Sequence, residues 1–90
     1  MIPVRAYSHR TVAVFGLART GLGAVRALEA GDAEVLAWDD NGPARQAGAE
    51  QGAVITPWRE WQWENIAALI LSPGVPLTHP RPHAIVNLPW

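Results

Sequence analysis

A short apolar run that leads into a glycine-containing loop and a helical pattern constrains the fold of this 90-residue chain most. Residues 11–15 (TVAVF) are apolar and rich in β-branched side chains, as in a strand buried inside a parallel sheet. The glycine loop, residues 16–21 (GLARTG), follows, and over residues 20–30 apolar and small side chains recur at helical spacing. Thr20 is the expected N-cap of this helix and Gly31 its expected end. Together these segments predict an α/β fold.

Further segments continue the alternation of strand and helix. The expected elements are a strand at 34–38, a helix at 44–51 that Pro43 begins and Gly52 ends, and strands at 53–56 and 67–71. This order implies parallel pairing with right-handed crossovers. Residues 57–65 fit no regular element; we expect Trp58, Trp61 and Trp63 to pack over a sheet edge or against a further domain rather than to stack on a base.

The length of the chain suits one domain and not two. We therefore expect residues 1–90 to form a single Rossmann-like, three-layer α/β domain with about four parallel strands. The proline-rich stretch after Gly74 leaves little room for further elements, so the sheet is expected to be incomplete at its C-terminal side. This favours either a small self-contained domain or the front piece of a longer protein.

Composition excludes several function classes. The chain has no cysteine, and all seven basic residues are arginine. Without a lysine it can form neither an ATP-binding P-loop nor a Schiff base. His79 and His83 lack the further ligands of a zinc site, so no metal site is expected. A net charge of −1 gives no reason to expect nucleic acid as a partner, and no apolar run approaches a membrane span or a signal peptide, which favours the cytoplasm.

The glycine loop carries the main candidate site. A helix N-terminus presents unpaired N–H groups and a partial positive charge, which attract phosphate. Arg19 can grip a diphosphate and Thr20 can donate to it, although a solvated arginine and a simple helix cap are the alternatives. Dinucleotide-binding loops have a glycine where Ala18 stands, and the alanine methyl group would crowd a pyrophosphate lying on the backbone. A purely structural tight turn is the remaining alternative.

Two other groups of residues are expected beside this loop, because ligands of open parallel sheets bind at the carboxyl ends of the strands. Asp39 follows the second strand, where an acid accepts hydrogen bonds from a ribose or a base; Asp40 is a second candidate. Either residue could instead be an ordinary turn former. Residues 72–74 (Ser-Pro-Gly) follow the fourth strand, and Gly74 would let a nucleoside approach the backbone unless the segment is merely a bend. No catalytic triad or carboxylate pair can be argued.

Three segments together resemble a known family. The runs TVAVFGLARTGLGAVRALEAG, EVLAWDDN and AALILSPGVPLTHP are similar, in one register over residues 11–83, to the N-terminal domain of the D-glutamate-adding Mur ligases of peptidoglycan synthesis. The sequence SPGVPLTHP after a buried strand is the most specific part. The resemblance implies a Rossmann-like domain that holds the UDP end of UDP-N-acetylmuramoyl-L-alanine, with Ala18 as a departure from the family's glycine.

The resemblance also implies roles for individual residues. Residues 17–20 would contact the diphosphate, Asp39 and Asp40 would face the uracil and ribose, and Gly74 would lie against the uridine. The complete set of expected UDP-binding residues is Gly16, Leu17, Ala18, Arg19, Thr20, Gly21, Asp39, Asp40, Ser72, Pro73 and Gly74. In the family, ATP, magnesium and the catalytic lysine belong to a central domain and D-glutamate to a third domain. With neither domain, no cofactor and no catalytic residue are expected in these 90 residues, and no ligation by them alone.

Two other functions stay open at this point. An NAD-binding domain of an oxidoreductase would also have a glycine loop and an acid after the second strand, although Ala18, the adjacent Asp40 and the Ser-Pro-Gly turn count against it. The third interpretation is an interaction module that kept the fold but lost the ligand. The intact glycine loop and the acid at position 39 count against it.

Overall fold

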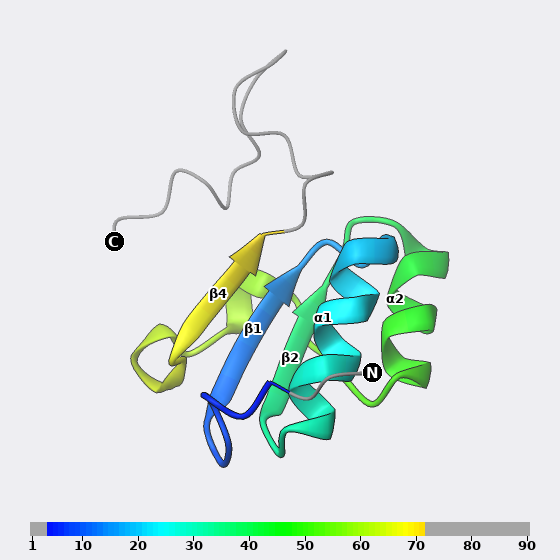
Figure 1. The fold of residues 1–90 in the computed structure, drawn as a ribbon. Coiled ribbons are helices and arrows are strands. Elements are labelled where there is room, and N and C mark those ends of the chain that lie inside the picture. Colours follow the sequence, from blue (N-terminus) through cyan, green and yellow to red (C-terminus); the bar gives the residue numbers. More distant parts are fainter. Residues whose placement is uncertain (1–3, 72–90) are drawn as a thin grey trace.

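Four parallel strands and two helices make up the described part of the chain, residues 4–71 of a computed structural model (Figure 1). The elements are β1 (Thr11–Phe15), α1 (Arg19–Ala30), β2 (Glu34–Trp38), α2 (Gly42–Glu50), β3 (Val54–Ile55), the 3₁₀ helices η1 (Trp58–Glu60) and η2 (Trp63–Asn65), and β4 (Ala68–Leu71). The strand order is β3-β2-β1-β4, and every pair is parallel. The expected small parallel α/β fold is confirmed. Neither described helix is long and apolar enough to cross a membrane.

The predicted boundaries of the elements hold to within one or two residues. β1 and β2 span the predicted residues, whereas β3 and β4 are shorter and α2 begins two residues earlier. The prediction of Thr20 as the N-cap is wrong. Ala18 holds that position, with an extended backbone (φ −74°, ψ −172°), so α1 starts directly from the glycine loop and Thr20 already lies in its first turn.

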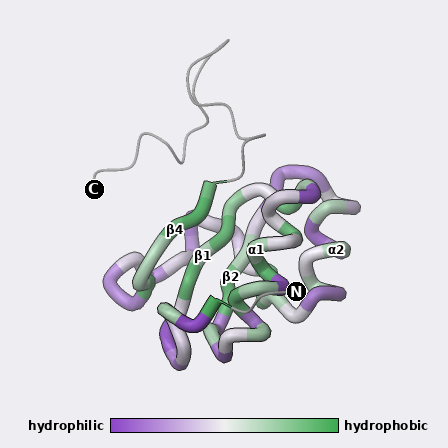
Figure 2. The backbone as a smooth tube through the Cα atoms, in the orientation of Figure 1, coloured by the Kyte–Doolittle hydropathy of each residue, from purple (hydrophilic) through white to green (hydrophobic). Residues whose placement is uncertain are grey.

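One face of the sheet packs against both helices. Val12 and Val14 of β1 and Val35 of β2 point to this side, where they meet Val25 and Leu28 of α1. All five side chains are at most 2% exposed. Figure 2 shows the same pattern along the backbone, with hydrophobic strands and more hydrophilic connections. Because successive side chains of a strand point to opposite faces, the uninterrupted apolar run of β1 requires a second core on the other side.

Tryptophans supply that second core. Trp58 and Trp61 are buried against Ala13 and Phe15 of β1, and Trp63 packs beside them. The Trp61 ring meets Phe15 edge-on at 6.5 Å and Trp63 at 5.5 Å between ring centroids, and its Nε1 donates to the Thr56 carbonyl oxygen at 2.9 Å. The expected packing over a sheet edge is therefore corrected: this segment, which we call the tryptophan layer, covers the sheet face opposite the helices and forms the third layer.

Gly31 ends α1, as predicted, but not through a left-handed conformation. Its φ of −94° is accessible to any residue. Glycine is needed because a Cβ atom here would collide with the backbone carbonyl of Val4. The close approach lets the Val4 N–H donate to the carbonyl oxygen of Ala27 at 2.9 Å, which ties the segment before β1 to the end of α1.

Glu29 gives the first testable prediction, a pH dependence of stability. Burial at the end of α1, and secondarily the negative charge of Glu34, raise the pKa of the Glu29 carboxyl above its ordinary value of 4.5. A carboxyl whose pKa is raised on folding favours the folded state below the ordinary value, and this contribution is lost as the pH rises through the folded pKa. Glu29→Gln should therefore raise the melting temperature at pH 7 and leave it nearly unchanged near pH 4. Thermal melts at both pH values test this; an equal gain at both would contradict it.

Candidate functional site

The carboxyl ends of three strands lie level with one another at one edge of the sheet. Phe15, the last residue of β1, pairs with Trp38, the last residue of β2, and with Leu71, the last residue of β4. The glycine loop leaves the sheet at this edge, at the arrowhead end of β1 in Figure 1. The predicted residues Ser72, Pro73 and Gly74 follow Leu71 in the sequence and lie outside the described residues. Ligands of open parallel sheets bind at such an edge.

The glycine loop divides into a buried frame and an exposed rim. Gly16, Leu17 and Gly21 are buried, whereas residues 18–20 (Ala, Arg, Thr) are exposed. Gly16 has a φ of +97°, a conformation that side chains strongly disfavour, and its N–H donates to the carbonyl oxygen of Trp38 at 2.9 Å. The side chain of Leu17 belongs to the helix-side core and is 1% exposed. Within the glycine loop, therefore, only the side chains of the exposed rim can contact a ligand, and Arg19 and Thr20 are the polar ones among them.

The N-terminus of α1 is open in a way that the N-terminus of α2 is not. No side chain caps α1, and its first turn contains no acidic residue. In α2, by contrast, the Asn41 side chain accepts a hydrogen bond from the Ala44 N–H at 3.0 Å. An uncapped N-terminus leaves backbone N–H groups and the positive end of the helix dipole free to meet an anion. Within residues 4–71, the loop end of α1 is therefore the better placed of the two helix N-termini for a phosphate.

Asp39 joins the loop to the end of β2. Its Oδ2 accepts a hydrogen bond from the Leu17 N–H at 2.7 Å, and its Oδ1 accepts one from the Asn41 N–H at 2.8 Å. The turn-forming role and the site role of Asp39 are therefore not exclusive. An ionised carboxylate has about four acceptor positions, so these two bonds leave capacity for a ligand. The structure brings Asp39 to the glycine loop, as the sequence predicted, although through a bond within the protein.

Three side chains around Asp39 form a cluster that the sequence did not reveal. The Arg45 guanidinium of α2 lies over the Trp38 ring, 4.5 Å from its centroid, and Arg45 Nη1 donates to the Asp39 carbonyl oxygen at 2.8 Å. Trp38 Nε1 donates to Asp40 Oδ1 at 3.2 Å, so the exposed Asp40 is at present partnered within the protein. The turn residues and Pro43 indicate in the sequence that a helix starts after Asp40. No sequence pattern indicates that the Arg45 side chain of this helix points back to the end of β2.

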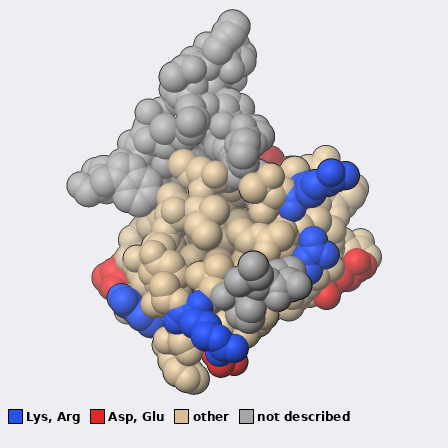
Figure 3. All heavy atoms as spheres, in the orientation of Figure 1, with Lys and Arg blue, Asp and Glu red and all other residues tan. Residues whose placement is uncertain are grey.

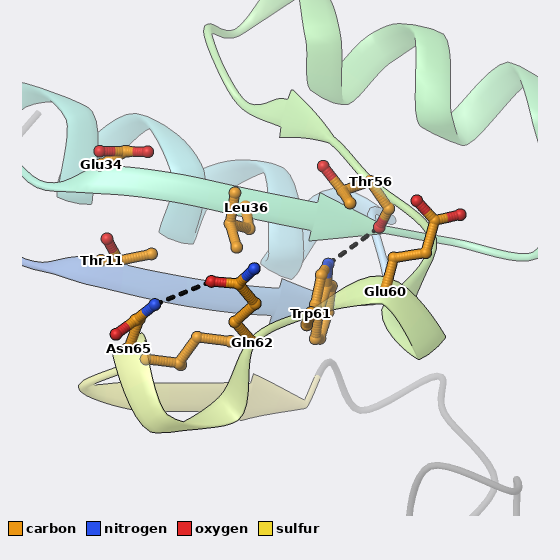
Figure 4. A pocket seen from close by; sticks show the side chains of 9 residues that line it. Thr11, Glu34, Leu36, Thr56, Glu60, Trp61, Gln62 and Asn65 are labelled. Atoms are coloured by element: carbon orange, nitrogen blue, oxygen red, sulfur yellow. Dashed lines mark hydrogen bonds between the residues drawn. The ribbon is translucent and has the colours of Figure 1, made fainter.

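Two hollows lined by described residues lie away from this edge. One, of about 280 Å³, lies on the sheet face opposite the helices, between β1, β2 and the tryptophan layer (Figure 4). Thr11, Glu34 and Leu36 of the strands and Glu60, Trp61 and Asn65 of the tryptophan layer are among the residues that line it. The other, of about 290 Å³, lies beside His9 and Glu64. Glu34 and Glu60, both exposed, line the first hollow and would repel a diphosphate. The first hollow is therefore less suited to a diphosphate than the glycine loop, whereas Arg10 and Glu64 place charges of both signs around the second.

Charges are distributed without one dominant patch on the face that Figure 3 shows, where small groups of basic side chains with acidic ones beside them lie around a largely uncharged middle. No group of three or more histidine, cysteine, aspartate or glutamate side chains within residues 4–71 is arranged to hold a metal ion.

Comparisons with known proteins identify relatives of the chain. No protein-family model and no solved structure matches it. Among curated proteins, it is 58% identical over 97% of its length to a UDP-N-acetylmuramoylalanine–D-glutamate ligase of Phenylobacterium zucineum. It is 54% identical over 97% of its length to the ligase of the same name from Caulobacter vibrioides, and 53% identical over 92% to that of Nitrobacter winogradskyi. The chain spans only 18–19% of the length of these relatives. The chain is thus a homologue of the N-terminal region of the UDP-N-acetylmuramoylalanine–D-glutamate ligases.

Proposed function

We propose that this chain binds the UDP moiety of UDP-N-acetylmuramoyl-L-alanine as the N-terminal domain of an ATP-dependent ligase that adds D-glutamate in peptidoglycan synthesis. The observation that carries the proposal is the uncapped N-terminus of α1 beside Asp39, in a chain whose relatives are ligases named for a UDP-linked substrate. The phosphate end of such a substrate is attracted to helix N–H groups, and the uridine end needs hydrogen-bond acceptors, which carboxylates supply.

The geometry supports one orientation of this ligand. The diphosphate lies over the exposed rim of the glycine loop, within reach of the N-terminus of α1, Arg19 and Thr20. The uridine lies toward Asp39 and Asp40 at the end of β2, on the side away from the diphosphate charge. Ser72, Pro73 and Gly74 complete the proposed contacts. Ala18 adds a methyl group at the rim, which is more compatible with a diphosphate held from one side than with a pyrophosphate lying flat on the loop.

The chemistry of ligation belongs to other parts of the proposed protein. The 90 residues contain no lysine and no P-loop sequence, so ATP and magnesium would be held by a central domain and D-glutamate by a third domain. These domains are the proposed partners of the chain, in the cytoplasm. Nothing among the described residues supplies a group that could activate a carboxylate, and we expect the 90-residue chain alone to release no phosphate from ATP in the presence of both substrates.

A titration with UDP tests the proposed binding. We expect UDP to shift the backbone amide resonances of residues 16–21 in the ¹⁵N-labelled chain, and NAD at the same concentration to leave them in place. Arg19→Ala should weaken UDP binding by about 1–3 kcal/mol, the range of a charge-assisted contact, whereas Arg26→Ala, an equally exposed arginine on the same helix, should not. Shifts with NAD only would favour an oxidoreductase domain, and no shifts with either nucleotide would favour an interaction module.

A further inference from the structure

We propose that Arg45 is a positioning residue for this site, which acts through Asp39 and holds the glycine loop ready for the nucleotide. The inference rests on the proposed function, because it concerns the affinity of the same site for UDP. Arg45 lies at the end of the first turn of α2 and, like Asp39, is half-buried. It is not among the expected UDP-binding residues, and within residues 4–71 its guanidinium contacts the end of β2 and the residue that follows it.

The first step is the link between Arg45 and the loop, which runs through a single residue. Arg45 Nη1 donates to the backbone carbonyl of Asp39 at 2.8 Å, and the side chain of the same Asp39 accepts from the Leu17 N–H at 2.7 Å. The guanidinium therefore holds the backbone from which the carboxylate projects. A small rotation of that backbone would move Oδ2 away from Leu17 and release the loop from the end of β2.

The second step concerns the way in which the guanidinium itself is held. Its Cζ lies over the Trp38 ring, 4.5 Å from the ring centroid, and Trp38 Nε1 donates in turn to Asp40 Oδ1 at 3.2 Å. The backbone N–H of Arg45 donates to the carbonyl oxygen of Asn41 at 3.1 Å. This bond holds the backbone of Arg45 close to the turn after β2, from where its side chain extends to Asp39. The guanidinium of arginine can contact the Trp38 ring and donate to the Asp39 carbonyl oxygen at the same time, and the compact ammonium of lysine is a poor substitute at such a site.

The third step separates positioning from simple attraction between charges. An arginine near a diphosphate could raise affinity by its charge alone, and a lysine would then serve as well. If Arg45 acts through its contact with the Trp38 ring and its bond to Asp39, lysine will not replace it. The chain contains a matched control, since the Arg59 guanidinium lies over the Trp58 ring at 4.4 Å in the tryptophan layer, and no described contact joins it to the glycine loop.

The experiment compares Arg45→Met, Arg45→Lys and Arg59→Met with the unaltered 90-residue chain, by NMR without ligand and by titration with UDP. Without ligand, we expect both Arg45 variants to shift the Leu17 amide proton upfield and to speed its exchange with solvent, because its bond to Asp39 is loosened. UDP affinity should fall about tenfold in both, equivalent to about 1.4 kcal/mol, and stay within twofold of the unaltered chain in Arg59→Met. If Arg45→Met is too unstable to measure, Arg45→Lys alone carries the test.

The outcomes separate this inference from the proposed function. Failure of the unaltered chain to bind UDP would overturn both. If the unaltered chain binds UDP but Arg45→Lys binds it equally well, or the Leu17 amide is unmoved in both Arg45 variants, the positioning role of Arg45 is wrong and the proposed function stands. An equal loss of affinity in Arg59→Met would show that loss of any arginine–tryptophan contact weakens the whole domain, which also overturns the inference.

Discussion

Asp39→Asn is expected to abolish most UDP binding and to destabilise the fold. Both carboxylate oxygens accept from backbone N–H groups, those of Leu17 and Asn41. An asparagine amide has one acceptor oxygen, which can serve only one of these two N–H groups. Its NH₂ group is a donor and would face the other N–H, so that neither could accept the hydrogen bond. Losing a charge-assisted hydrogen bond costs about 1.5–3 kcal/mol, so UDP affinity should fall by at least about tenfold, and the melting temperature by roughly 6–24 °C.

A matched variant makes this prediction specific. Asp32→Asn makes the same chemical change at an exposed turn, where the left-handed backbone (φ +69°) suits asparagine as well as aspartate. We expect it to leave both the melting temperature and UDP binding close to those of the unaltered chain. Differential scanning fluorimetry and isothermal titration calorimetry would measure the two effects. If Asp39→Asn kept parental UDP affinity with the Leu17 amide still protected from exchange, Asp39 would be a turn former only.

Trp61→Ala is expected to have the largest effect on stability. The side chain is 5% exposed, packs edge-on against Phe15 and Trp63, and donates to the Thr56 carbonyl oxygen. Truncation of a buried aromatic residue costs about 3–5 kcal/mol. A domain of this size has about 5–13 kcal/mol of total stability, so the variant should lose roughly a quarter of it or more and unfold at much lower urea concentration.

Graded substitutions test whether the tryptophan layer acts as a core. Trp61→Phe keeps a smaller aromatic ring against Phe15 and loses the indole N–H and part of the ring volume, so it should cost less than Trp61→Ala. Trp63→Ala removes a half-buried ring and should also cost less than Trp61→Ala. Urea unfolding followed by circular dichroism avoids the change in tryptophan fluorescence itself. If Trp61→Ala lowered the free energy of unfolding by less than about 1 kcal/mol, the tryptophan layer would not act as a core of this domain.

Much of the fold could be predicted because its signals are local in sequence. The unbroken apolar run of β1 requires burial on both faces, the spacing of Val25 and Leu28 requires a helix with one buried side, and glycine or proline marks most ends. Parallel pairing then follows from the alternation of strand and helix.

The candidate site could be located but not described from sequence. Gly16 and Asp39 stand where strands end, and parallel strands bring such ends to one edge, which the register of Phe15 with Trp38 confirms. The partners of these residues were not predictable. The bond from Leu17 to Asp39 and the contact of Arg45 with Trp38 depend on side-chain directions and on the angle between β2 and α2, which no short-range pattern encodes.

By itself, the sequence determined the α/β class, the place of the glycine loop between β1 and α1, and the acids beside it, because backbone preference and hydrophobic periodicity act over a few residues. Only the tertiary structure decided that the tryptophans form a core on the second face, that Ala18 rather than Thr20 begins α1, and that Gly31 is required by the carbonyl of Val4. These features depend on packing between segments distant in the chain, where volume, close approach and hydrogen-bond geometry outweigh local preference.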